Sequence, residues 1–253
     1  MMKQVFRLSV FVIGLASFAS QASAQNLPWE GRGFLNVNLG IQVAAEDVAT
    51  TNTTFSLYDE TGKLTTAQTI DSQAQFWDIG GGLRIAGNFG VGFTYTRLSA
   101  TGSAEVNAQV PSPIYYDQPR TATATVDDLD HVEDGYHFQA VWMLPITDKV
   151  DIIFSGGPSV FNLKQGIVTS PQITEGAPPY STVNMTVSQA TTTGSQVGFN
   201  IGADLTYRFA NNVGIGALVR YAAATVSLEP EGGEPSDVKV GGFQIGGGLR
   251  IRF

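Results

Sequence analysis

The clearest pattern in this chain is an alternation of apolar and polar side chains with a period of two. In the final stretch, from Gly241 to Phe253, the two parities separate cleanly: Phe243, Ile245, Leu249, Ile251 and Phe253 on one, and Gln244, Arg250 and Arg252 on the other. Such a period predicts a β-strand with one apolar and one polar face. An apolar terminal strand is a poor open edge of a sheet, but a closed barrel needs it to pair with the first strand.

The same alternation recurs along the chain and predicts an antiparallel set of eight strands. The other seven segments are Leu35–Val43, Trp77–Ile85, Phe89–Thr96, Tyr136–Leu144, a strand that starts at Val150, Val197–Arg208 and Val213–Tyr221. In the strand from Val150, the run Gly156-Gly157-Pro158 predicts a β-bulge, because proline cannot donate to a ladder.

The connections between these strands alternate between short and long. The short ones are Ala86-Gly87-Asn88, Thr147-Asp148-Lys149 and Ala210-Asn211-Asn212, and the long ones cover about 44–73, 99–134, 164–196 and 225–239. Strands of roughly nine to eleven residues cross a bilayer at a tilt. Tight turns on the periplasmic side and long loops outside are typical of outer-membrane barrels.

The long loops contain alternating pieces of their own. Phe55–Leu64 reads as a hairpin around Thr61-Gly62, and Thr121–Val126 reads as a short strand. These pieces predict hairpins that rise above the membrane, with irregular solvated loop as the alternative.

Aromatic side chains on the apolar faces fall into two bands by their distance from the tight turns. The periplasmic band holds Phe89, Trp142, Tyr207 and Phe253, and the outer band holds Trp77, Tyr95, Tyr136 and Tyr221. Two such girdles are expected where aromatic rings sit at the headgroups, whereas a soluble sandwich has no reason to band its rings by height.

The N-terminus predicts a secretory signal peptide over residues 1–24. Lys3 and Arg7 precede an apolar stretch, and Ala22-Ser23-Ala24 supplies the small residues of a cleavage site. Removing these 24 of the 253 residues leaves about 229, which suits one barrel domain over 25–253.

Composition narrows the function further. The chain has 29 glycines and no cysteine, so it holds neither a disulfide framework nor a thiolate metal site. Without the signal segment, 12 basic residues face 22 acidic ones, a net charge of about −10. That balance excludes nucleic acid as an expected partner.

The chain resembles the small eight-stranded outer-membrane β-barrel family and is similar to the OmpA-like transmembrane domain. Three features carry the resemblance: the signal peptide, the segment Phe89-Gly90-Val91-Gly92-Phe93 and the terminal Leu249-Arg250-Ile251-Arg252-Phe253. The resemblance implies an all-β fold, a closed antiparallel eight-stranded transmembrane up-and-down β-barrel in the bacterial outer membrane. It also implies a monomer surrounded by lipid and lipopolysaccharide.

Within that resemblance, Leu249, Ile251 and Phe253 are the expected signal to the barrel-assembly machinery. The chain departs from OmpA by stopping at Phe253, so we expect no periplasmic peptidoglycan-binding domain and carry over no cell-wall tethering.

The polar parity of the strands should face a lumen that side chains nearly fill. Its charged members are Asp78, Arg84, Asp151, Asp204, Arg208, Arg220 and Arg250, and its amides are Asn36, Asn38, Gln139, Asn200 and Gln244. Opposite charges confined there must pair. We expect Asp151 to pair with Arg208 on the adjacent strand, with Arg84 and Arg250 as further partners. The network is either a structural ionic plug or a gated ion path; a wide pore would need more strands.

The predicted long loops hold most of the acidic residues, with the densest run at Asp127–Gly135. This run lacks the spacing of a Ca²⁺-binding loop, so we expect no dedicated metal site and no cofactor, but a solvated rim where divalent ions bridge to lipid headgroups.

An enzyme is also not expected. Only two histidines occur, His131 in the acidic run and His137 near the outer mouth. A serine facing His137 could come from Ser99 or Ser159, but no nucleophile motif surrounds either serine.

The sequence therefore predicts a structural or surface-binding role, adhesion included, through long acidic extracellular loops. A narrow channel for ions or small solutes is the main alternative, and a lipid A-modifying enzyme is the less favoured one.

Overall fold

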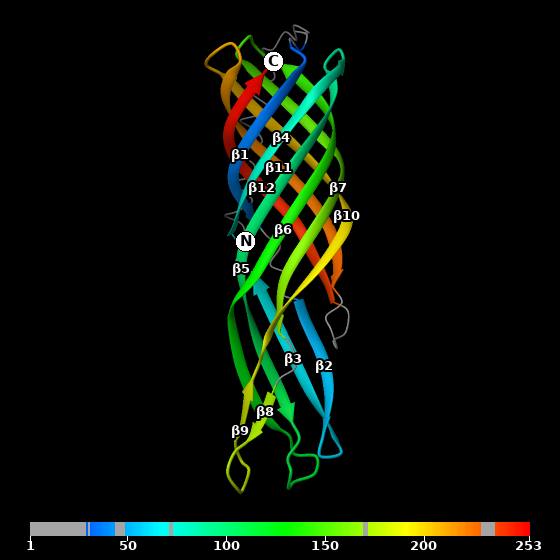
Figure 1. Cartoon of the computed structure of the whole chain (residues 1–253), viewed down its shortest axis with the longest axis vertical. Helices are drawn as coiled ribbons and strands as arrows, with labels where there is room; N and C mark the ends of the chain where they lie inside the picture. The colour runs from blue at the N-terminus through cyan, green and yellow to red at the C-terminus, as the bar shows by residue number, and fades with distance from the viewer. Residues whose placement is uncertain (1–28, 30, 44–48, 71–72, 169–171, 229–235) are drawn as a thin grey trace, which may run out of the picture.

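The computed structural model describes residues 29, 31–43, 49–70, 73–168, 172–228 and 236–253, and these residues form one elongated β-structure (Figure 1). No helix among them is long and apolar enough to cross a bilayer. The predicted signal peptide lies outside the described residues.

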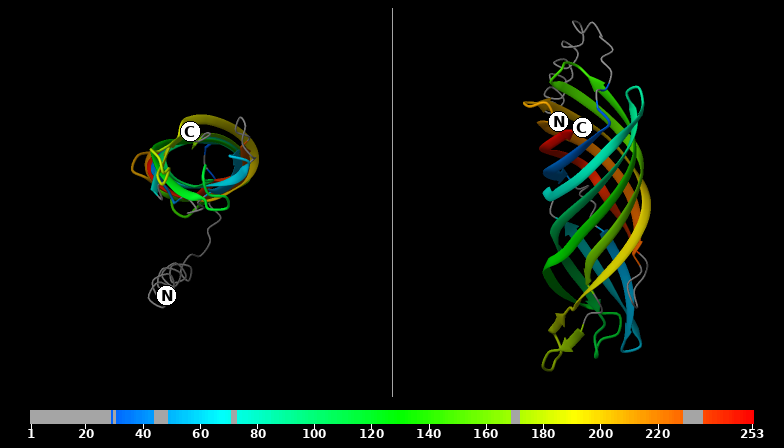
Figure 2. Two further views of the ribbon diagram at one scale, coloured as in Figure 1. Left: turned by 90° about the horizontal axis from the view of Figure 1, so that it is seen from below. Right: turned by 45° about the horizontal axis from the view of Figure 1, so that its top comes forward.

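Eight strands close into a ring. They are β1 (Gly33–Val43), β4 (Gln73–Ala86), β5 (Phe89–Val110), β6 (Arg120–Pro145), β7 (Val150–Val168), β10 (Gln189–Arg208), β11 (Val213–Leu228) and β12 (Ser236–Arg252). Each pairs antiparallel with its neighbour, and β12 pairs with β1 from Phe34↔Arg252 to Val43↔Phe243. The predicted eight strands and their closure are thus confirmed, and an end-on view shows the ring (Figure 2).

The stagger of the ring follows from the paired residues. Starting at Gly33, the partners around the ring are Leu83, Val91, Ala140, Gly156, Ile201, Tyr221, Phe243 and finally Val43. One circuit therefore ends ten residues further along β1. A stagger of this size requires the strands to tilt by roughly 40° to the barrel axis.

The lipid-facing parity is the predicted one. Leu205, Ile215 and Leu249 point outward and are 47%, 55% and 54% exposed. The outer aromatic band is present as neighbouring rings, with Trp77 and Tyr95 centred 5.4 Å apart and Tyr95 and Tyr136 5.3 Å apart. At the other end, Phe89 stacks on Trp142 at 6.3 Å.

We call the end with the tight turns and the C-terminus the proximal end, and the opposite end the distal end. In Figure 1 the proximal end is at the top. There the carbonyl of Phe253 accepts a hydrogen bond from the Gly33 amide at 2.8 Å, and the Phe253 amide donates to the Gly33 carbonyl at 3.0 Å. These bonds fasten the last residue to the first strand.

The predicted long loops at 44–73, 99–134 and 164–196 are mostly strand where the structure describes them, so that prediction is wrong there; residues 229–235 of the fourth lie outside the described residues. β5 and β6 contain 22 and 26 residues, and β7 and β10 contain 19 and 20, so they continue far past the outer aromatic band. Small apolar residues point into this extension (Ala104, Val106, Ala108, Val110 and Ala122). Their burial removes apolar surface from water, which stabilises the continued strands.

Two hairpins complete the distal extension. β2 (Ala49–Leu57) and β3 (Glu60–Ile70) form one, and β3 joins the main sheet through β5. β8 (Gln172–Glu175) and β9 (Val183–Thr186) form the other as a separate sheet. The hairpin predicted over Phe55–Leu64 exists, but it turns at Tyr58-Asp59 rather than at Thr61-Gly62, and the strand predicted over Thr121–Val126 is part of β6.

The predicted bulge at Gly156-Gly157-Pro158 is also wrong. β7 runs through these residues with no register shift against β10 or β6. The Asn200 side-chain amide donates to the Gly157 carbonyl at 3.0 Å, which helps hold this stretch in line. Register shifts occur instead between Arg84 and Ala86 and between Gly102 and Ala104.

Candidate functional site

The lumen holds three buried carboxylates, each paired with an arginine. The tightest pair joins β10 to β12: the Arg250 guanidinium donates to both oxygens of Asp204, at 2.8 and 2.6 Å. Two parallel bonds of this kind are the strongest arrangement for an arginine and a carboxylate. Arg250 is fully buried, so the pair replaces the water that both groups gave up.

Asp151 lies nearer the proximal end, and its main partner differs from the predicted one. Arg252 donates to Asp151 at 3.0 Å, to the Thr206 hydroxyl at 2.6 Å and to the Asn36 amide oxygen at 3.0 Å. The expected partner Arg208 is 3.8 Å away and more exposed. The charged lumen residues predicted from the sequence omit Arg252, although it shares the polar parity of Arg250 in the terminal strand.

The third pair lies further toward the distal end. Arg220 on β11 and Asp78 on β4 are 3.1 Å apart, and both side chains are almost completely buried. Arg220 also donates to Gln244 at 2.6 Å and to Thr96 at 2.7 Å, while Asn38 donates to Asp78 at 2.7 Å. Six of the seven predicted charged residues therefore lie in ion pairs.

Arg84 is the exception. Its side chain is exposed at the proximal end and donates to the backbone carbonyl of Trp29. No carboxylate among the described residues lies within ion-pair distance of it. Arg84 keeps the register of β4, paired with Gly90, and the shift begins only after it.

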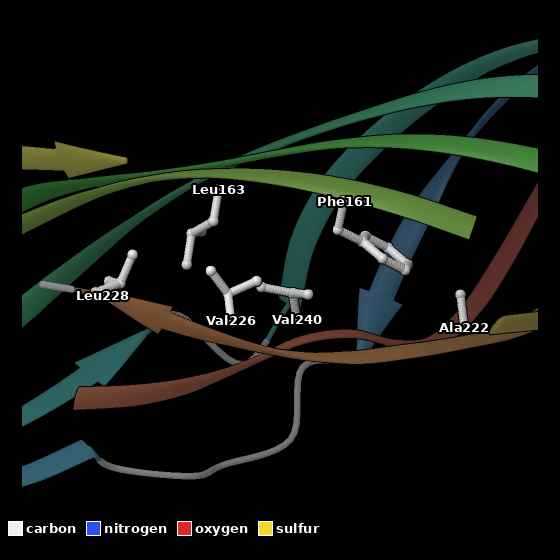
Figure 3. Close-up of a cluster of buried hydrophobic side chains, with 6 residues drawn as sticks. All are labelled: Phe161, Leu163, Ala222, Val226, Leu228 and Val240. Atoms are coloured by element: carbon white, nitrogen blue, oxygen red, sulfur yellow. The ribbon is translucent and has the colours of Figure 1, made fainter. Parts of the chain in front are cut away.

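Two clusters of buried apolar side chains also fill the lumen, one toward each end of the barrel. The proximal apolar cluster contains Trp29, Phe34, Val141, Met143 and Ile153. The distal apolar cluster contains Phe161, Leu163, Ala222, Val226, Leu228 and Val240, which point from β7, β11 and β12 toward one another (Figure 3).

Between the two clusters lies a cavity of about 30 Å³, lined by Asn38, Asp78 and Gln139 among others. This volume holds about one water molecule. The cavity is therefore a small pocket of the lumen, and Phe34, Ile153 and Leu218 line it together with the polar side chains.

His137 and Ser159 do meet in the lumen. The His137 Nδ1 atom lies 2.8 Å from the Ser159 hydroxyl, and that hydroxyl accepts a hydrogen bond from Asn200 at 2.8 Å. Both side chains are fully buried, and the His137 Nε2 atom has no hydrogen-bond partner in the described structure. A nucleophile of the serine–histidine type needs a third group that orients the base and an approach for substrate. Neither is present around this pair in the described residues.

His131 belongs to a second polar cluster, beyond the outer aromatic band. Its Nδ1 faces the Gln165 side-chain oxygen and its Nε2 lies 2.8 Å from a Glu133 oxygen. Burial alone would lower the pKa of His131, but the hydrogen bond and charge of Glu133, with Gln165, raise the pKa above 6.5. An acceptor at each nitrogen favours the imidazolium form of the ring.

The other Glu133 oxygen accepts a hydrogen bond from the Gly241 amide at 2.9 Å, so this cluster ties β6 to β12 across the distal mouth. Gly241 has φ +86°, and a side chain there would meet the Ala222 carbonyl oxygen at 2.2 Å. Among the described residues, no group of three or more histidine, aspartate or glutamate side chains is placed to hold a metal ion.

Comparison with known proteins agrees with this architecture. The model of the outer membrane protein β-barrel domain matches residues 10–250. This chain belongs to that family. It is a protein of the bacterial outer membrane.

Three solved structures illustrate what the barrel is similar to. Neisserial surface protein A is 13% identical over 87% of this chain and 97% of its own, with a TM-score of 0.44. The attachment invasion locus protein Ail of Yersinia pestis is 13% identical over 87% and 99%, with a TM-score of 0.37. The outer membrane protease OmpT of Escherichia coli is 10% identical over 88% and 94%, with a TM-score of 0.34. Among curated proteins, no sequence matches this chain.

Proposed function

We propose that this protein is a surface-binding protein, in which a filled barrel anchors an extracellular β-extension that contacts partners outside the cell. The observation that carries the proposal is the difference between the membrane part of the barrel and the part beyond it. The membrane part is filled with ion pairs and apolar clusters, and β5, β6, β7 and β10 then continue outward as a support. Binding residues are commonly carried on loops that a rigid scaffold positions.

A narrow channel is the alternative that this packing disfavours. Ions would have to pass the buried, packed side chains around Trp29 and those around Phe161. The refolded protein in a planar bilayer should therefore show no discrete conductance steps at neutral pH. Reproducible single-channel steps would contradict the filled lumen.

The binding role is tested by shortening the extension. Residues 105–125, between the paired Ala104 and Val126, can be replaced by an Asn-Gly turn, which suits a two-residue hairpin. Cells that display this variant should adhere to protein-coated surfaces several-fold less than cells with the full chain. Equal adhesion, with the variant folded and at equal abundance, would contradict the proposal.

The same reasoning extends to partners and catalysis. We propose that the outward apolar faces contact lipid and lipopolysaccharide, that the barrel works as a monomer, and that the terminal Leu249, Ile251 and Phe253 serve its assembly.

We also propose that the protein performs no catalysis, because the buried His137–Ser159 pair has no route for substrate. The mass of lipid A should then be the same with and without expression of the protein.

A further inference from the structure

Three segments meet at the far end of the extension, which we call the distal tip. It comprises the β2–β3 turn (57–60), the β5–β6 connection with the first residue of β6 (111–120) and the β8–β9 hairpin turn with its flanking residues (175–183), all at the bottom of Figure 1. The three are joined by hydrogen bonds between side chains and backbone, so the tip has one defined shape.

Arg120 is the centre of these bonds. Its guanidinium pairs with both oxygens of Glu175 and donates to the carbonyls of Tyr180 and Pro111, at 2.9 and 2.6 Å. Glu175 in turn accepts a hydrogen bond from the Tyr58 hydroxyl at 3.1 Å. The hydrogen bonds from Arg120 lower the pKa of Glu175, so this pair stays ionised and its charges cancel.

The β5–β6 connection is fixed in the same way. The Ser112 hydroxyl accepts hydrogen bonds from the amides of Ile114 and Tyr115, at 3.3 and 3.2 Å. Glu60 accepts one from the Asp117 amide at 3.0 Å, which links this connection to the β2–β3 turn. The side chains between these anchors are therefore presented in a fixed arrangement rather than on a loose loop.

The large exposed side chains of the tip are three tyrosines and an isoleucine. Tyr116 is 82% exposed, Tyr115 57%, Ile114 52% and Tyr58 45%. Tyrosine is enriched in binding surfaces because it offers a broad, stiff contact area at a small cost in conformational entropy. Unlike Trp77 or Tyr136, these rings lie far beyond the membrane band, so lipid does not account for their exposure.

The charge around the rings selects the partner. The distal tip contains four acidic residues, Asp59, Glu60, Asp117 and Glu175, and one basic residue, Arg120, whose charge Glu175 neutralises. The remaining carboxylates flank exposed tyrosine faces. Lysine and arginine side chains satisfy both features at once, since they pair with carboxylates and lie over aromatic rings.

We propose that the distal tip is a docking surface for a protein face rich in lysine and arginine, with Tyr115 and Tyr116 as the aromatic contacts and Asp59 and Asp117 as the charged ones. This inference rests on the proposed binding function and names the site and the kind of partner. A neutral glycan is the competing ligand, because sugars also stack on tyrosine, but they gain nothing from the carboxylates.

The test uses the full chain refolded in lipid nanodiscs and three immobilised probes: a basic protein, the same protein with its lysines acetylated, and a neutral dextran. The basic protein should bind, acetylation should abolish binding, and dextran should not bind.

Tyr115→Ser combined with Tyr116→Ser should weaken binding of the basic protein about tenfold with no change of charge. Asp117→Asn should weaken it less and reduce its dependence on salt.

Asp128→Asn is the matched control. Asp128 is exposed and has φ +58°, nearly the same as the +57° of Asp117, and it lies outside the distal tip. Asparagine tolerates this backbone region, so both variants should fold with the same loss of charge. Tyr116→Ser alone is the second variant in case the double one fails to fold, which heat-dependent gel mobility reports.

Three results would overturn the inference. Equal losses for Asp117→Asn and Asp128→Asn with no effect of the tyrosines would mean diffuse attraction between charges. Binding to dextran that depends on the tyrosines would assign the tip to a glycan, and no binding to any probe would remove the site. In each case the proposed binding function is judged separately, by the adhesion of cells with the shortened extension.

Discussion

Each buried carboxylate of the lumen reaches its arginine across the barrel rather than along one ladder. Asp78 on β4 and Arg220 on β11 are separated by two intervening strands, β1 and β12. Asp151 on β7 and Arg252 on β12 are likewise separated by β10 and β11. These pairs therefore brace opposite walls, and each depends on the whole ring being closed.

Breaking the proximal pair should be costly. Asp151→Ala leaves Arg252 buried without a charge partner, which typically costs about 3–5 kcal/mol of unfolding free energy. In double-mutant cycles from urea unfolding, Asp151 should couple more strongly to Arg252→Ala than to Arg208→Ala, because Arg208 is 3.8 Å away and partly solvated. Strictly additive effects with both arginines would show that the pairs do not stabilise the barrel as a network.

A neighbouring pair of residues tests the two faces of β10. Leu205 faces lipid and Thr206 faces the lumen, where its hydroxyl accepts a hydrogen bond from Arg252. Leu205→Arg should cost about 2–4 kcal/mol of unfolding free energy, as charges facing the middle of the bilayer do. Thr206→Ser keeps the hydroxyl and should cost far less. If arginine at either position were tolerated equally, the inside–outside assignment of this strand would be wrong.

At the scale of strands, the cluster of His131, Glu133 and Gly241 makes the distal mouth sensitive to pH. The folded state raises the pKa of His131. The contribution of its ion pair with Glu133 to the free energy of unfolding is therefore complete below pH 6.5 and is lost as the pH rises through the folded pKa. The urea midpoint of the wild type should exceed that of His131→Gln most on the acid side. A difference in urea midpoint between wild type and His131→Gln that does not change with pH would contradict an ion pair between His131 and Glu133.

The strands themselves can be predicted from sequence because parity is a local property. Each of the eight strands, and the lumen side of Asp78, Asp204 and Arg250, follows from a period of two. The partner of each charge cannot be predicted in this way, because it depends on the ten-residue stagger and on the reach of long side chains across the barrel. In β5 the contrast between faces is weak over Thr101-Gly102-Ser103, but Ala104 to Val110 alternates with a period of two again, so the distal part of this strand does carry the pattern in its sequence.

For the whole molecule, closure is the property that a simple experiment reports. Because every strand of the ring is paired on both sides, the folded barrel should resist detergent and migrate differently on a denaturing gel before and after boiling. Identical mobility, together with recovery in the soluble periplasmic fraction, would contradict the barrel. A sample unfolded in urea gives the reference position of the open chain.

The uninterrupted strands also decide how the protein responds to mechanical load. A pull on the distal tip is transmitted into β5, β6, β7 and β10, which run from the extension into the membrane without a break. Much of that force lies along the strand axes, so the hydrogen bonds of each ladder share the load and must shear together. If flexible loops joined the tip to the barrel, the hydrogen bonds of a ladder could break one after another. The continuity of these four strands thus lets their ladders carry a pulling force together.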